Sequence, residues 1–170
     1  MNDIIINKVQ SIQRCIDRAK EEYALAGDNF SYDYSRQDAA ILNITRACEQ
    51  AIDLANHVIK SYKLGIPTSS AESFELLARK NIIPRETERK MKKMVGFRNT
   101  AIHQYQGLNL EIVKTVIMVG LDDLLDFTQS IIRLYRKPTP VRVQNQPIFI
   151  INISFNINEM SMIYAYRLLE

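Results

Sequence analysis

Apolar residues recur every three or four positions along most of the first 136 residues of the chain. This spacing puts them on one face of a helix and predicts amphipathic α-helices. Gly27 is expected to end the first helix, and Gly65 with Pro67 the second. The first helix carries the stripe Ile5, Val9, Ile12, Ile16, Ala19 and Tyr23; the second carries Ile41, Ile44, Cys48, Ala51, Ala55, Val58 and Tyr62.

Residues typical of helix starts precede the second helix and predict a third and a fourth. Ser35 followed by Asp38 predicts a capped start for the second helix, and Ser69 followed by Glu72 predicts one for a short third helix. Pro84 suits the first turn of a fourth helix, since its missing N–H costs nothing there.

A long last helix is expected from about Leu110. Long helices with short connections predict an all-α, up-and-down bundle of about five helices over residues 1–136. The last helix has the apolar face Val113, Ile117, Leu121, Leu124, Phe127, Ile131 and Leu134.

Residues 137–170 follow a different pattern and are expected to form a separate tail. From Ile151 to Asn158 apolar and polar residues alternate one by one, which is typical of a strand. A lone strand does not stabilise itself, so this strand-like tail must pair with another surface or remain unpaired.

Composition fits one folded domain of 170 residues, with 46% hydrophobic and 24% charged residues. The net charge of +3 permits a nucleic-acid partner without requiring one.

Cys15 and Cys48 lie too far apart for a metal-binding pair, and reduced thiols are expected. The N-terminus lacks the features of a signal peptide, and no apolar run approaches the ~20 residues that span a bilayer. We therefore expect a cytoplasmic protein without a membrane partner.

The segment GFRNTAIHQY, residues 96–105, concentrates reactive side chains. Arg98 continues the apolar stripe of the fourth helix, where an unpaired buried charge would cost several kcal/mol, so a carboxylate, a phosphate or a wet groove must compensate it. His103 lies about 140° round the helix and roughly 7.5 Å along it, and Tyr105 returns to the side of Arg98. Three such groups suit a groove. Each also has an ordinary explanation: an ion pair at a helix crossing, a surface histidine and a core tyrosine.

The motif Arg98-Asn99-x-x-x-His103-x-Tyr105 resembles the signature of HEPN-domain ribonucleases, in the form found in the HepT toxin branch. The blocks AILNITRACEQAIDLANHVI, GIPTSSAESFELLARKNII and KMVGFRNTAIHQY resemble HepT sequences in the same order. The resemblance covers roughly residues 1–136 and implies an HEPN-like helical domain.

This resemblance implies a metal-independent endoribonuclease toxin that uses the 2′-hydroxyl of RNA as nucleophile. His103 would transfer protons and Arg98 would stabilise charge on the phosphate, with Asn99 in support. No cofactor is expected. The resemblance also implies a homodimer, in which a two-fold axis doubles both groups in one cleft.

Regulation is implied by the same resemblance. A nucleotidyltransferase antitoxin of the MntA type would transfer AMP from ATP to Tyr105, and the added bulk and charge would block RNA. Magnesium and ATP would belong to that partner.

Two further features have alternative explanations. The basic side made of Arg85, Arg89, Lys92 and Lys93 would guide RNA, or is simply a solvated face. Asp122, Asp123 and Asp126 are expected to be surface charges rather than metal ligands. The alternative to the ribonuclease is a non-catalytic helical module that binds RNA or a nucleotidyltransferase.

Overall fold

The computed structural model describes residues 3–103 and 108–136. All of them lie within a compact unit that spans Met1–Pro138. The strand-like tail predicted for residues 137–170 lies outside the described residues and stays a prediction.

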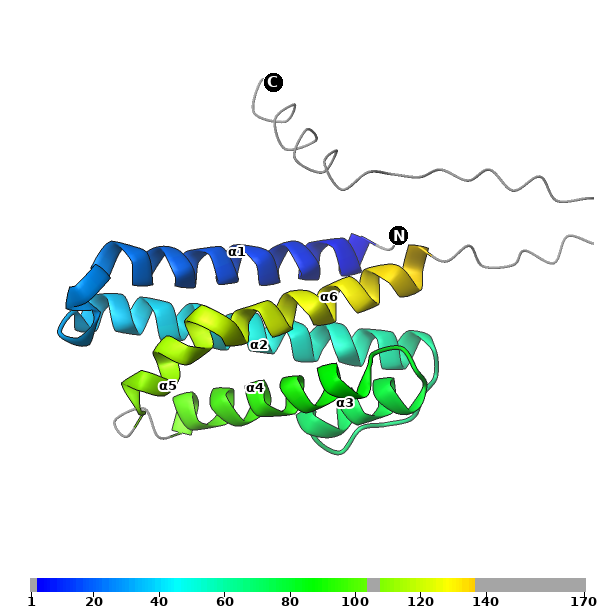
Figure 1. Ribbon diagram of the computed structural model, residues 1–170. Coiled ribbons are helices and arrows are strands. Elements are labelled where there is room, and N and C mark those ends of the chain that lie inside the picture. Colours follow the sequence, from blue (N-terminus) through cyan, green and yellow to red (C-terminus); the bar gives the residue numbers. More distant parts are fainter. Residues whose placement is uncertain (1–2, 104–107, 137–170) are drawn as a thin grey trace, which may run out of the picture. The chain divides into compact units, whose positions relative to one another are not determined.

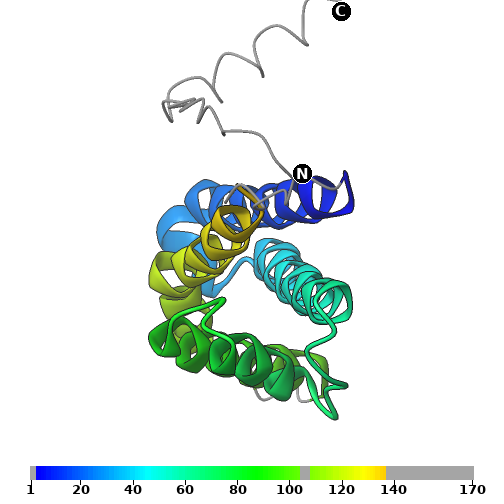
Figure 2. The same cartoon turned by 90° about the vertical axis from the view of Figure 1, so that its right-hand side faces the viewer.

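Every regular element in the described part of the chain is helical, and none of its helices is long and apolar enough to cross a membrane. Helices α1, α2, α4 and the α5–α6 rod alternate in direction (Figure 1) and lie side by side around a common core (Figure 2). This confirms the predicted all-α, up-and-down bundle. The elements are α1 (Asp3–Ala26), the 3₁₀ turn η1 (Gly27–Ser31), α2 (Tyr34–Ser61), α3 (Ser70–Arg79), α4 (Arg85–His103), α5 (Leu110–Thr115), the π-helical turn η3 (Val116–Gly120) and α6 (Leu121–Arg136).

The ends of the first two helices show which local signals operate. Gly27 follows α1 with a φ of +52°, a left-handed conformation that glycine adopts without strain, as expected for a helix stop. The predicted start at Ser35 is wrong. Asp33 caps α2 instead, because its Oδ1 accepts the N–H of Arg36 at 3.1 Å.

The third helix begins as predicted. Ser69 Oγ accepts the N–H of Glu72 at 3.1 Å, and Glu72 in turn accepts the N–H of Thr68 at 2.6 Å. Pro84 lies one position before α4, where its carbonyl accepts the N–H of Glu88 at 3.0 Å.

The predicted apolar stripes form the core. Most of their members are buried, and α1 packs along α2 while α4 packs on α2, α3 and α6. Phe74 of α3 and Phe127 of α6 meet edge to face with ring centroids 5.3 Å apart. Tyr62 departs from the prediction: it follows the last residue of α2 and is exposed.

A buried ionic cluster also joins α1 to α2. Glu22 is only 3% exposed, and its carboxylate accepts Arg18 of α1 at 2.7 Å and Arg36 of α2 at 2.6 Å. The two guanidinium groups compensate the charge that burial would otherwise penalise.

Candidate active site

The motif occupies the last turns of α4. Met91, Met94, Val95 and Ala101 of this helix are buried against the rest of the bundle. They hold the helix in place and leave Arg98 half-buried at the edge of the core.

Arg98 forms an ion pair with a carboxylate on another helix. Its Nε donates to Glu49 Oε1 of α2, and its Nη2 lies against the same oxygen. Its Nη1 donates to Asn99 Oδ1 at 2.9 Å. The Arg98 side chain is 25% exposed and that of Glu49 38%, so the pair lies at the rim of the bundle rather than in a sealed interior. Glu49 supplies the compensation that the sequence predicts, and part of the Arg98 side chain stays exposed.

Glu49 was not among the residues predicted from the sequence. It lies 49 positions before Arg98, and on its own helix it is an ordinary polar residue beside the apolar stripe. Only the packing of α2 against α4 brings it to the motif.

His103 is the last residue of α4 and is exposed. In the described part of the chain no hydrogen bond joins it to Arg98. One chain therefore presents the two groups about 140° apart on one helix rather than in contact. Tyr105 lies outside the described residues, so its predicted modification stays a prediction.

Two exposed apolar side chains share the helix faces that carry the ion pair. Leu42 lies seven residues before Glu49 and so on the same face of α2. Ile102 lies four residues after Arg98 and so on the same face of α4. They are 48% and 46% exposed. Because α2 and α4 run in opposite directions (Figure 1), both lie toward the end of the bundle where α4 finishes.

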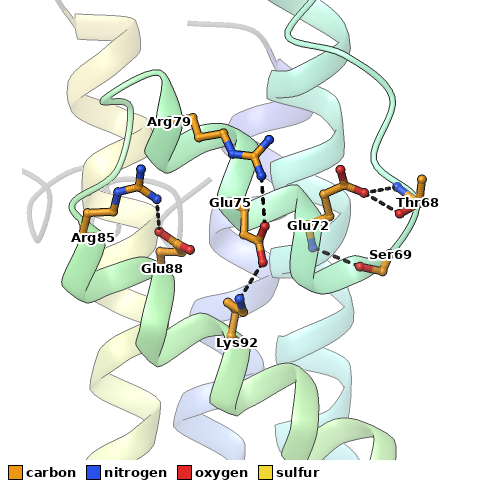
Figure 3. Close-up of polar contacts among 8 residues, drawn as sticks. All are labelled: Thr68, Ser69, Glu72, Glu75, Arg79, Arg85, Glu88 and Lys92. Atoms are coloured by element: carbon orange, nitrogen blue, oxygen red, sulfur yellow. Dashed lines mark hydrogen bonds and ion pairs between the residues drawn. The ribbon is translucent and has the colours of Figure 1, made fainter.

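The predicted basic side of α4 is partly neutralised by carboxylates. Lys92 donates to Glu75 of α3 at 2.5 Å, and Arg85 to Glu88 at 2.8 Å (Figure 3). The bond from Lys92 lowers the pKa of the Glu75 carboxyl. Arg85 thus forms an ion pair within the first turn of α4, and Lys92 joins α4 to α3.

Arg89 and Lys93 differ from their neighbours. Both are exposed, and neither forms an ion pair with another described residue. Being four positions apart, they share one face of α4. Of the four predicted cations, these two are the ones without a carboxylate partner among the described residues, and their predicted contact with RNA stays a prediction.

The other side chains with possible chemistry, a cysteine and two aspartates, are accounted for by burial and by ion pairs. Burial raises the pKa of the Cys48 thiol from 9.0 to about 12; the adjacent Glu49 carboxylate adds to the shift and Arg98 opposes it. Asp122 pairs with Lys20 at 2.9 Å and Asp123 with Lys90 at 3.0 Å, so these two are surface charges as expected. Within the described residues no three acidic, histidine or cysteine side chains gather where they could hold a metal ion.

A cavity of about 360 Å³ lies at the other end of α4. Arg85, Ser130 and Arg133 are among its lining residues. Arg85 and Arg98 are thirteen positions apart, about 20 Å along the helix, so the cavity is separate from the motif.

An antiparallel helical bundle whose fourth helix ends in Arg-Asn-x-x-x-His at a polar rim is the arrangement that the resemblance to HEPN domains implies. Comparison with protein families matches residues 12–131 to the family described as ribonuclease HepT-like. The mRNA nuclease HepT of Shewanella oneidensis is 49% identical over 131 residues, which are 77% of this chain and 98% of that protein. The chain belongs to the ribonuclease HepT-like family. This confirms the predicted family and the predicted class of enzyme, a ribonuclease.

Solved structures agree with this assignment. The tri-AMPylated HEPN toxin of Shewanella oneidensis, in complex with MNT antitoxin, is 47% identical with a TM-score of 0.75, over 78% of this chain and 99% of that one. The cytosolic protein of unknown function YutE from Bacillus subtilis is 19% identical with a TM-score of 0.58, over 74% of this chain and 88% of that one. The second likeness shows the fold alone.

Proposed function

We propose that this protein is an endoribonuclease toxin that cleaves RNA without a metal ion, with Arg98 and His103 as its catalytic residues. The observation that carries the proposal is the partly exposed guanidinium of Arg98, held at the rim of the bundle on the helix that ends in His103. The 49% identity to an mRNA nuclease HepT supports RNA as the substrate.

The chemistry needs only these side chains and the substrate. The 2′-hydroxyl of the ribose attacks the adjacent phosphorus, and the bond to the 5′-oxygen of the next nucleotide breaks. His103 accepts or donates the proton, because imidazole exchanges protons near neutral pH. Arg98 binds the non-bridging phosphate oxygens as their charge grows, and Asn99 orients the guanidinium through the bond from Nη1. DNA lacks the 2′-hydroxyl and would be inert.

A homodimer would complete the site. Within one chain Arg98 and His103 do not meet, and a two-fold axis beside α4 would bring both groups of each chain into one cleft. The exposed Leu42 and Ile102, on the same helix faces as Glu49 and Arg98, support a contact on this side, since apolar side chains of this size gain from burial.

The proposed regulator is a nucleotidyltransferase antitoxin of the MntA type. Its support is the related toxin, which is AMPylated and in complex with MNT antitoxin. AMP attached to Tyr105, two positions after His103, would add bulk and negative charge beside the imidazole. ATP and magnesium would serve the antitoxin, and both proteins would act in the cytoplasm, where mRNA is found.

Cleavage in a chelator tests the catalytic proposal. The purified protein should cut RNA in the presence of EDTA, and His103→Ala should abolish cutting while the thermal unfolding curve is unchanged. The all-deoxy version of the same oligonucleotide should remain intact. If wild type and His103→Ala bind RNA equally and neither cuts it, the protein is a non-catalytic binding module.

Intact-mass measurement tests the regulation. After incubation with the antitoxin, ATP and magnesium, the wild-type mass should rise by whole AMP groups, whereas Tyr105→Phe should keep its mass. AMP groups on Tyr105→Phe would place the modification elsewhere.

A further inference from the structure

Glu49 is the closest charged neighbour of the catalytic arginine, although it lies outside the motif. It contacts two of the three guanidinium nitrogens, Nε and Nη2, through a single oxygen. The third nitrogen, Nη1, is bonded to Asn99. The guanidinium plane is therefore fixed from two helices, by Glu49 on α2 and by Asn99 on α4.

This arrangement leaves part of the guanidinium for a ligand. Arginine has five N–H groups, one on Nε and two on each Nη. Glu49 and Asn99 engage one group on each of the three nitrogens, so one N–H of Nη1 and one of Nη2 remain. Two N–H groups of a planar fork match two oxygens of a phosphate.

Stability does not account for the pair. Ion pairs at a partly exposed rim contribute little to folding, and the packing of α4 on α2 and α3 rests on buried apolar side chains. Orienting a mobile four-bond side chain has a larger effect on a reaction, because a misplacement of about 1 Å can slow it about 100-fold.

We infer that Glu49 is a positioning residue for cleavage: it holds the Arg98 guanidinium in the orientation that binds the phosphate in the transition state. The inference rests on the proposed ribonuclease function. It also predicts how the kinetic constants divide. The Glu49 carboxylate cancels much of the charge of Arg98, so the ion pair attracts RNA weakly. The contribution of Glu49 therefore appears in kcat rather than in KM.

The test compares Glu49→Ala with Glu49→Gln in the full-length chain. Glu49→Ala should lower kcat about 10- to 100-fold and leave KM unchanged or lower. Glu49→Gln keeps an acceptor oxygen and should retain most of the rate.

Asp53→Ala is the matched control. Asp53 lies one turn further along α2 and forms an exposed pair with Lys8 at 3.0 Å. Its loss removes a comparable ion pair without touching Arg98, so kcat should stay at the wild-type value. If Glu49→Ala cleaves as fast as wild type or faster, or if Glu49→Gln is as slow as Glu49→Ala, positioning by this carboxylate is wrong.

A readout without RNA separates this inference from the proposed function. In ¹H–¹⁵N spectra the Nε–H of Arg98 should give a sharp, exchange-protected signal in wild type and Asp53→Ala, and lose it in Glu49→Ala. A signal that survives in Glu49→Ala overturns the inference even if the protein cuts RNA. Conversely, a protein that keeps this pattern but cuts no RNA has the anchored guanidinium without the proposed function, and positioning for cleavage falls with that function.

Discussion

At the scale of single residues, Arg98 shows how a charge can occupy an apolar stripe. It continues the line of Val95 and Ala101, yet its guanidinium reaches the rim and is bonded there on two sides. Such a group is fixed in direction without being removed from water, which is the condition that a phosphate-binding fork requires.

The shape of this group can be tested apart from its charge. Arg98→Lys keeps a cation but replaces the planar fork by a single ammonium, which cannot contact Glu49, Asn99 and two phosphate oxygens together. The cleavage rate under single-turnover conditions should fall about 100-fold. Thermal unfolding should shift little, because the side chain is at the rim. A variant with wild-type cleavage would mean that Arg98 contributes charge only.

The two cysteines should differ in reactivity for a reason visible at this scale. Burial raises the pKa of Cys48 to about 12, so the folded protein holds it as the unreactive thiol throughout the neutral range. Burial also raises the pKa of Cys15, which is only half-buried. A thiol reagent at pH 8 should label Cys15 in the folded protein and Cys48 only when denaturant is added, as peptide mapping will show. Labelling of native Cys48 would indicate that α2 opens locally.

At the scale of elements, the caps of the helices carry measurable energy. Ser69 Oγ caps α3 through Glu72, and Glu72 returns to Thr68. Ser69→Ala should lower the free energy of unfolding by about 1 kcal/mol. Ser70→Ala is the matched control, since Ser70 is the first residue inside the helix and serves no cap; it should change stability much less. Urea denaturation of both variants gives the comparison.

The elements themselves were largely predictable, because helical periodicity and caps are local. Gly27 and Ser69 end and begin helices where the sequence indicates. The start of α2 was misplaced because Asp33 and Ser35 are both good capping residues, and the choice depends on which one the preceding turn η1 presents. The π-helical turn η3 has no such marker, since its apolar residues also fit an α-helix.

At the scale of the molecule, Glu22 joins the first two long helices through buried charge. Glu22→Gln would keep the side-chain shape but remove the charge that Arg18 and Arg36 share, and should lower the free energy of unfolding by about 1–3 kcal/mol. Glu21→Gln is the control: Glu21 also pairs with Arg18, at 2.8 Å, but is exposed. Its loss should cost less than about 0.5 kcal/mol. Equal effects in denaturant unfolding would contradict a special contribution from burial.

Contacts between distant positions set the limit of sequence reasoning here. The motif gave Arg98, Asn99 and His103, because these residues lie close together on one helix. Glu49 and the partners of Glu22 could not be found in this way, since charged residues are frequent on every helix and only packing selects the pairs. The partial neutralisation of the basic side by Glu75 follows from packing too.

The straight course of α4 has a consequence for the length of a substrate. From Arg89, the first cation of α4 without an ion pair to another described residue, to His103 the helix rises over fourteen residues, about 21 Å. A nucleic-acid strand advances about 3.4 Å per nucleotide when stacked, so roughly six nucleotides bridge the interval. Oligonucleotides shorter than this could reach the imidazole but not the distant cations, and their capture would depend less on ionic strength. Binding along α4 would thus favour long transcripts over short fragments.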